Sequence, residues 1–117
     1  MTAPNIVNVA TITGKTAVQA VGTSATAIVT NPGSSNKVFK INALYVSNVD
    51  GTNAANINVS VQRSGTDYHI GKTISVPADS TLDVISKSLY LEEGDALRLL
   101  ASVASDLEAV CSYEEIS

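Results

Sequence analysis

Apolar and polar residues alternate with a period of two along much of this chain. In residues 56–63, Ile57, Val59 and Val61 fall on one face and polar side chains fall on the other. This pattern predicts an antiparallel strand with one wet face. Residues 67–76 repeat it after a short glycine-containing turn, so the two runs predict a β-hairpin. The second run is expected to place Tyr68, Ile70, Lys72, Ile74 and Val76 on one face.

Weaker versions of the same pattern predict further strands. They cover residues 5–12, 16–21, 25–30, 37–48, 82–86, 95–103 and 107–114. Within 37–48, an unbroken alternation would put Phe39, Ile41, Ala43 and Tyr45 on one face. Leu44 and Val46 would then lie on the opposite face, so the second half of this strand is expected to be covered on both sides. Residues 89–95 leave room for a half-turn of helix.

Turn-forming residues separate these runs. Gly, Pro, Asn, Asp and Ser gather at residues 31–36, 50–53, 77–81 and 92–95. Strands of this length between such turns are typical of β-sandwiches. The sequence therefore predicts an all-β, single-domain antiparallel β-sandwich of jelly-roll or immunoglobulin-like type, with about 7–9 strands. The length of 117 residues fits one domain.

The first thirty residues differ from the rest. Residues 1–30 are rich in Thr and Ala, and Lys15 is their only charged side chain. We expect either an edge-strand segment of the sandwich or an arm that docks on a neighbouring subunit, with residues 31–117 forming the sandwich core. In the arm interpretation, Ile6, Val7 and Val9 are the predicted partner interface.

Composition supports the strand prediction and argues against two classes of partner. Val, Ile and Thr supply 14, 9 and 11 residues, and these β-branched side chains favour strands. Only 15% of the residues are charged, and the net charge is −4. A chain with 7 Lys and Arg residues against 11 Asp and Glu is poorly suited to nucleic acid or to anionic lipid. No apolar stretch is long enough for a transmembrane helix.

Catalytic chemistry has few candidates. His69 and Cys111 are the only histidine and cysteine. His69 falls on the wet face of the predicted hairpin, and Cys111 falls in an alternating strand as a buried structural thiol without a visible activating base. One cysteine excludes an intrachain disulfide. We therefore predict a protein that is not an enzyme and uses no cofactor.

Other motifs have simpler structural explanations. The adjacent pairs Glu92/Glu93 and Glu114/Glu115 should point apart, unlike the facing carboxylates of a glycosidase. Residues 50–53 (Asp-Gly-Thr-Asn) lack the spacing of a calcium loop and are interpreted as a hairpin turn. Gly14-Lys15-Thr16 lacks the upstream glycine of a phosphate-binding loop. We predict no metal site.

Two stretches carry a family resemblance. The first is residues 39–48 with the following Asp-Gly-Thr-Asn turn and residues 57–61. The second is residues 74–81 leading into 91–99. Together they resemble small virion structural proteins of tailed bacteriophages, particularly those of marine cyanobacterial phages, over roughly residues 36–113. The resemblance implies an all-β domain that works by assembly, often as a trimer, and it brings no catalytic residues.

Two functions follow as hypotheses. The first is a virion structural protein, a capsid decoration or head accessory protein that binds the major capsid protein and its own copies. It would assemble in the host bacterial cytoplasm, as a homo-oligomer with a trimer favoured. The second is a tail-fibre or baseplate-associated module that binds host glycan. The loops at 31–36, 50–55 and 64–67 would then be its contact set. The chain has no Trp, so Tyr68 and Tyr90 are the candidate aromatic contacts for a sugar.

Overall fold

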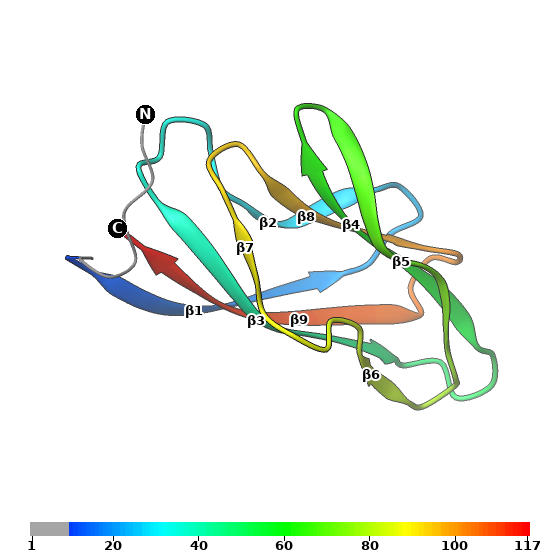
Figure 1. The fold of residues 1–117 in the computed structure, drawn as a ribbon. Helices are drawn as coiled ribbons and strands as arrows, with labels where there is room; N and C mark the ends of the chain where they lie inside the picture. The colour runs from blue at the N-terminus through cyan, green and yellow to red at the C-terminus, as the bar shows by residue number, and fades with distance from the viewer. Residues whose placement is uncertain (1–9) are drawn as a thin grey trace.

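Nine antiparallel strands form the protein, as the computed structural model of the chain shows for residues 10–117, the part that it describes (Figure 1). Their bounds are β1 Ile12–Ala20, β2 Thr26–Thr30, β3 Val38–Asn48, β4 Ala55–Arg63, β5 Thr66–Val76, β6 Thr81–Asp83, β7 Leu89–Leu91, β8 Ala96–Ala101 and β9 Leu107–Ile116. The fold is thus an all-β single-domain sandwich, as the alternating pattern predicted.

The strands form two sheets with a jelly-roll order. One sheet has the order β1-β9-β3-β6, with β7 pairing with β3 farther along the same edge; the other has the order β2-β8-β4-β5. Consecutive strands alternate between the sheets, apart from the β4–β5 hairpin and the pair β6 and β7. This arrangement is the jelly roll, one of the two sandwich types expected. Below, these are called the β1 sheet and the β5 sheet.

The predicted hairpin is present as β4 and β5. Arg63 pairs with Thr66, so the loop has two residues. Ser64 and Gly65 have φ values of 53° and 80°, the two positive angles of a type I′ turn. Glycine adopts that conformation readily, whereas the serine is held there by the turn.

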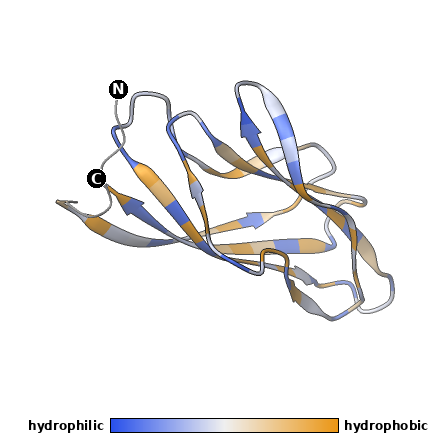
Figure 2. Ribbon diagram, in the orientation of Figure 1, coloured by the Kyte–Doolittle hydropathy of each residue, from blue (hydrophilic) through white to orange (hydrophobic). Residues whose placement is uncertain are grey.

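The core lies between the sheets and is mainly aliphatic. Figure 2 shows hydrophobic and hydrophilic bands alternating along the strands of both sheets. The largest fully buried apolar side chains are Ile41, Leu44, Ile57, Leu91, Leu97, Leu99, Leu107, Val21, Val46, Val59 and Val76. Phe39 and Tyr113 add aromatic bulk at one end, with ring centroids 5.7 Å apart. Burial of this apolar surface supplies the main driving force for folding.

For the second half of β3, the prediction of which side chains point to the core is wrong. The register against β9 shifts between Ile41 and Ala43, so Asn42 is a bulge residue. A bulge reverses the alternation. Ile41 and Leu44 therefore both face the core, whereas Tyr45 points outward and is 44% exposed. The second half of the strand is therefore covered on one side only.

Other local predictions also need correction. Residues 89–95 contain β7 and a turn, with no half-turn of helix. Residues 50–53 are not a hairpin turn, because β3 and β4 belong to different sheets. In β4, Ser60 is buried although it was expected on the wet face. Val103 lies beyond β8 and is 41% exposed.

The N-terminal third contributes to both sheets. β1 pairs with β9 over nine consecutive residues, and β2 pairs with β8. Residues 16–21 of the expected second strand lie within or directly after β1. Ile6, Val7 and Val9 lie outside the described residues. The division of the chain at residue 30 stays a prediction.

Candidate functional site

An apolar row crosses the outer face of the β1 sheet. Val18 pairs with Val110, and Val110 pairs with Tyr45. Directly paired residues share a face, so the three side chains form one line across β1, β9 and β3. They are 74%, 40% and 44% exposed. A hollow of about 320 Å³ lies against β1 and β9 beside Val18 and Val110. This apolar row offers apolar surface for a contact with another molecule.

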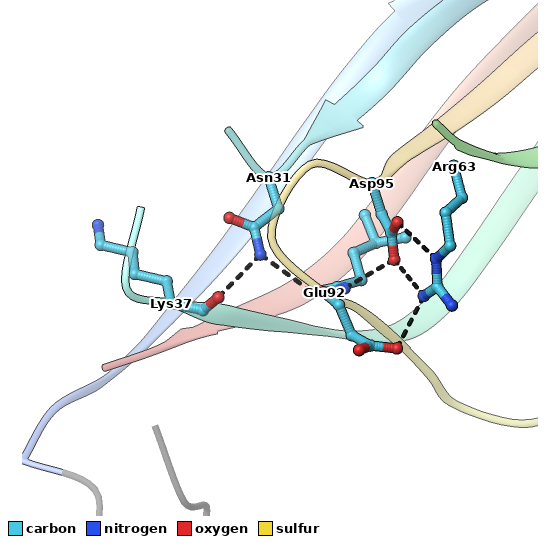
Figure 3. Close-up of polar contacts among 6 residues, drawn as sticks. Asn31, Lys37, Arg63, Glu92 and Asp95 are labelled. Atoms are coloured by element: carbon cyan, nitrogen blue, oxygen red, sulfur yellow. Dashed lines mark hydrogen bonds and ion pairs between the residues drawn. The ribbon is translucent and has the colours of Figure 1, made fainter. Parts of the chain in front are cut away.

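An ion-pair cluster holds one end of the sandwich together. Arg63 donates from Nε and Nη2 to the two carboxylate oxygens of Asp95, at 2.8 and 2.6 Å, and from Nη2 to Glu92 at 2.8 Å. The Asp95 side chain is only 2% exposed. It also accepts the backbone N–H of Glu92. Figure 3 shows Arg63 beside the carboxylates of Asp95 and Glu92, with its guanidinium group bonded to both.

The charges in this cluster shift one another's pKa. Burial alone would raise the pKa of Asp95, but the hydrogen bonds from Arg63 and from the Glu92 N–H, together with the charge of Arg63, lower it below 3.8. The hydrogen bonds and charge of Asp95, then of Glu92, raise the pKa of Arg63. The cluster therefore has one positive and two negative charges, and its arginine is already paired with carboxylates rather than free for an anionic ligand.

Asn31 joins the neighbouring loops to this end. It is fully buried, and its side-chain amide donates to the backbone oxygens of Lys37 and Leu91. Its backbone also exchanges hydrogen bonds with the 94–95 turn, through Asp95 O and Gly94 N. Figure 3 shows the amide directed at Lys37. Loop 31–36 is consequently fixed against the turn that follows β7.

A hollow lined by two tyrosines lies next to the cluster. Its volume is about 490 Å³, and its lining residues are Val61, Arg63, Tyr68, Ile70, Leu89 and Tyr90. Tyr68 and Tyr90 are 61% and 43% exposed, and they come from different sheets. Exposed aromatic faces beside an apolar surface suit the apolar faces of a sugar ring or a flat apolar group. We call this feature the tyrosine hollow.

The predicted glycan loops do not gather at one site. Residues 31–36 and the turn at 64–65 lie at the end that carries Asp95, as the contacts of Asn36 with Glu93 and of Arg63 with Asp95 show. Residues 50–53 lie at the opposite end, where Asp50 O accepts the N–H of Asp79. One ligand of modest size therefore cannot contact all three loops.

The predicted chemistry-bearing residues are kept apart. His69 is exposed on β5, whereas Cys111 is fully buried on β9 of the other sheet. Burial raises the pKa of the Cys111 thiol to about 11, so it stays protonated at neutral pH. The prediction of a buried structural thiol is confirmed.

The glutamate pairs point apart, as predicted. Glu92 contacts Arg63, whereas Glu93 accepts the backbone N–H of Asn36. Glu115 forms ion pairs with Lys15 at 2.9 Å and Lys37 at 3.1 Å. The hydrogen bond from Lys15, supported by Lys37, lowers the pKa of Glu115 despite partial burial.

The Asp50 turn and the acidic side chains show no metal site within residues 10–117. Asp50 accepts the backbone N–H groups of Thr52 and Asn53, so its carboxylate caps its own turn. Within residues 10–117, no group of three acidic, His or Cys side chains is arranged to hold a metal ion. The same residues contain no helix that is long and apolar enough to cross a membrane.

Sequence reasoning named Tyr68 and Tyr90 as candidate sugar contacts, but it did not bring them together, and it missed the apolar row. Tyr90 precedes a turn and carries no periodic signal, and only the fold brings β7 beside β5 in the tyrosine hollow. The alternation places Tyr45 on the same face as Phe39 and Ile41, because the Asn42 bulge leaves no mark in it. Val18 and Val110 belong to weaker runs, whose facing depends on the register.

Comparison with known proteins establishes the fold. No family model and no curated protein sequence matches the chain. A subunit of Bacillus endospore appendages, described as a family of disulfide-linked pili, is similar with a TM-score of 0.55 and 16% identity, over 92% of this chain and 88% of that one. At this identity, the likeness shows a shared fold alone.

Two more remote likenesses decide nothing about fold or function. A pentameric capsid protein from metagenomic phage sequences gives a TM-score of 0.45 at 20% identity, over 86% of this chain and 62% of that one. The nucleoplasmin-like N-terminal domain of Drosophila FKBP39 gives 0.44 at 14% identity, over 87% and 85%.

Proposed function

We propose that this chain is a non-enzymatic structural protein of a tailed-phage virion, a capsid decoration or head accessory protein that binds the major capsid protein and its own copies. The sequence resemblance over roughly residues 36–113 suggests the virion. Jelly rolls occur in viral capsid and lectin domains, among others, so the fold is compatible without being decisive. The likeness to a pilus subunit adds a second setting in which this fold builds assemblies.

The observation that carries the proposal is the apolar row of Val18, Val110 and Tyr45. Three large apolar side chains stand exposed side by side on a sheet face. The residues paired on either side of them are small or polar: Thr16 and Ser112 on one side, Ala20 and Glu108 on the other. An apolar centre with a polar rim is the usual anatomy of a protein interface. We propose that this face binds the capsid.

Capsid binding tests the proposal directly. Purified protein is mixed with matching capsids, and the bound fraction is measured by sedimentation; purified virions are searched for the chain by mass spectrometry. Val110→Glu should lower binding by at least about tenfold, because burying an unpaired charge is costly. Val103→Glu is the matched control, since Val103 is exposed to 41% against 40% for Val110. Absence from virions, or no capsid binding by the wild type, would refute the proposal.

The tyrosine hollow supports a second candidate function, a tail-fibre or baseplate-associated module that binds host glycan. Tyr68 and Tyr90 border the hollow from two sheets, and Ile70 and Leu89 supply its apolar lining. A glycan array should then give signals that Tyr68→Ala and Tyr90→Ala abolish. Tyr45→Ala is the control, because Tyr45 is as exposed as Tyr90 but lies on the outer face of the β1 sheet. No signal across host glycans would eliminate this function.

A further inference from the structure

Four sheet edges are present in residues 10–117, and β1 is the least protected of them. β6 and β7 form one edge with three residues each. β2 has five residues and a register shift. β5 is long, but two register shifts interrupt it and Thr73 has a φ of 58°. β1 pairs with β9 through nine consecutive residues without a shift. Short strands and bulges are the usual protection against edge pairing, and β1 has neither.

The charge that could protect β1 is directed elsewhere. Lys15 is its only charged residue, and a lysine on an edge strand normally discourages pairing. Its ammonium group, however, lies 2.9 Å from the carboxylate of Glu115 on β9. The lysine side chain is thus directed across the pair toward β9, away from the free edge. β1 also contains no proline.

The hydrogen-bond register identifies the free backbone groups of β1. Thr11 and Ser117 exchange two backbone hydrogen bonds, and Val21 N donates to Leu107 O. Hydrogen-bonded and non-hydrogen-bonded pairs alternate in an antiparallel ladder. The odd-numbered residues from 11 to 21 therefore direct their backbone N–H and C=O groups toward β9. The even-numbered residues therefore direct their N–H and C=O groups to the open side: Ile12, Gly14, Thr16, Val18 and Ala20. These groups form a ready template for another strand.

We propose that this edge binds the N-terminal segment, residues 1–9, of a second copy of the chain. The inference rests on the proposed assembly function and names its contact. Nine residues precede Ala10, and in an extended form they would span about 30 Å, the length of nine-residue β1. The segment contains Ile6, Val7 and Val9 and no charged side chain. β-Branched, uncharged residues suit an added strand.

A second copy suits this edge better than the chain's own N-terminus. To pair with its own β1, the segment would have to reverse at residues 10–11. Two-residue hairpin loops favour Gly, Asn or Asp, and the residues here are Ala10 and Thr11. The backbone N–H groups of both also donate to Ser117 O, which places Thr11 in the ladder with β9. Exchange between copies needs no such turn.

Disulfide trapping tests the contact in the full-length chain. Cysteine is introduced at Ile6, Val7 or Val9 in one preparation and as Thr16→Cys in another, and the two are mixed under mild oxidation. Thr16 is exposed at the middle of the free edge. At least one mixture should give a cross-linked dimer that neither preparation gives alone. Wild-type protein is the control, because Cys111 is buried.

Three outcomes would overturn the proposal. Cross-linking of Thr16→Cys with itself would mean that two β1 strands pair with each other. A cross-link that forms only when both cysteines are in the same chain would mean that the segment folds back on its own β1. No cross-link in any mixture would mean that the edge does not receive the segment.

Edge-blocking variants separate this contact from the proposed function. Thr16→Pro removes an outward N–H and no bond to β9, so the fold should persist by circular dichroism. The concentration for half-assembly, measured by light scattering, should rise by about tenfold or more. Ile12→Lys, at an exposed β1 position outside the apolar row, should act likewise, whereas Ile70→Lys on the bulged β5 edge should not. Unchanged assembly in both β1 variants refutes the contact alone; failure of the wild type to bind capsids refutes the function.

Discussion

Arg63 and Asp95 form a forked ion pair between the two sheets. Arg63 ends β4 of the β5 sheet, and Asp95 lies in the turn that connects β7 of the β1 sheet to β8. The two hydrogen bonds measure 2.8 and 2.6 Å, and the carboxylate is almost completely buried. The pair thus fastens the turn at one end of the sandwich, with Glu92 as a more exposed third member.

Asp95→Ala should destabilise the protein clearly. The substitution removes two charge-assisted hydrogen bonds from Arg63 and one from the Glu92 N–H, so we expect a loss of about 2–3 kcal/mol in the free energy of unfolding. Urea denaturation followed by circular dichroism measures it. Glu92→Ala is the control, and its loss should stay below about 1 kcal/mol because that side chain is 67% exposed. Equal losses of unfolding free energy in the two variants would contradict the conclusion that Asp95, rather than Glu92, is the main partner of Arg63.

Acid should lower the free energy of unfolding through two carboxylates, Asp95 and Glu115. Asp95 and Glu115 have folded-state pKa values below their ordinary 3.8 and 4.5, which the unfolded chain retains. Their contribution to stability is therefore present above pH 4.5 and is lost as the pH falls through the folded pKa values. The urea midpoint should fall steadily from about pH 5 to pH 3. The double variant Asp95→Asn, Glu115→Gln should flatten that slope; an unchanged slope would show that other groups control it.

The alternation predicted the strands well because burial on one face imposes a period of two. β4, β5, β8 and β9 lie close to their expected positions. The same pattern could not place a bulge, since one extra residue in β3 reverses the faces while the composition stays the same. The tyrosine hollow and the apolar row could not be predicted from the alternation for a related reason. Both bring together side chains from different strands, and the alternation does not determine which strands become neighbours.

The bulge at Asn42 should be essential for folding. Deleting this residue would restore simple alternation, so either Phe39 and Ile41 or Leu44 and Val46 would have to leave the core. Exposing two such side chains costs several kcal/mol, close to the whole stability of a small domain. We expect the deletion variant to be largely unfolded by circular dichroism. Asn42→Ala keeps the extra residue and should fold normally, because Asn42 is exposed. A folded deletion variant would refute this account of β3.

Cys111 should be inert in the folded subunit. It is fully buried on the central strand β9, and its pKa is raised to about 11, so little thiolate is available at neutral pH. Ellman's reagent at about pH 8 should therefore react negligibly with native protein, and stoichiometrically after unfolding in urea. The Thr16→Cys variant serves as the positive control for an accessible thiol. Assembly of this chain should accordingly be insensitive to reducing agents, unlike an assembly held by disulfides. Rapid labelling of the native thiol, or dissociation of wild-type assemblies by dithiothreitol, would show that Cys111 is reached from outside the core.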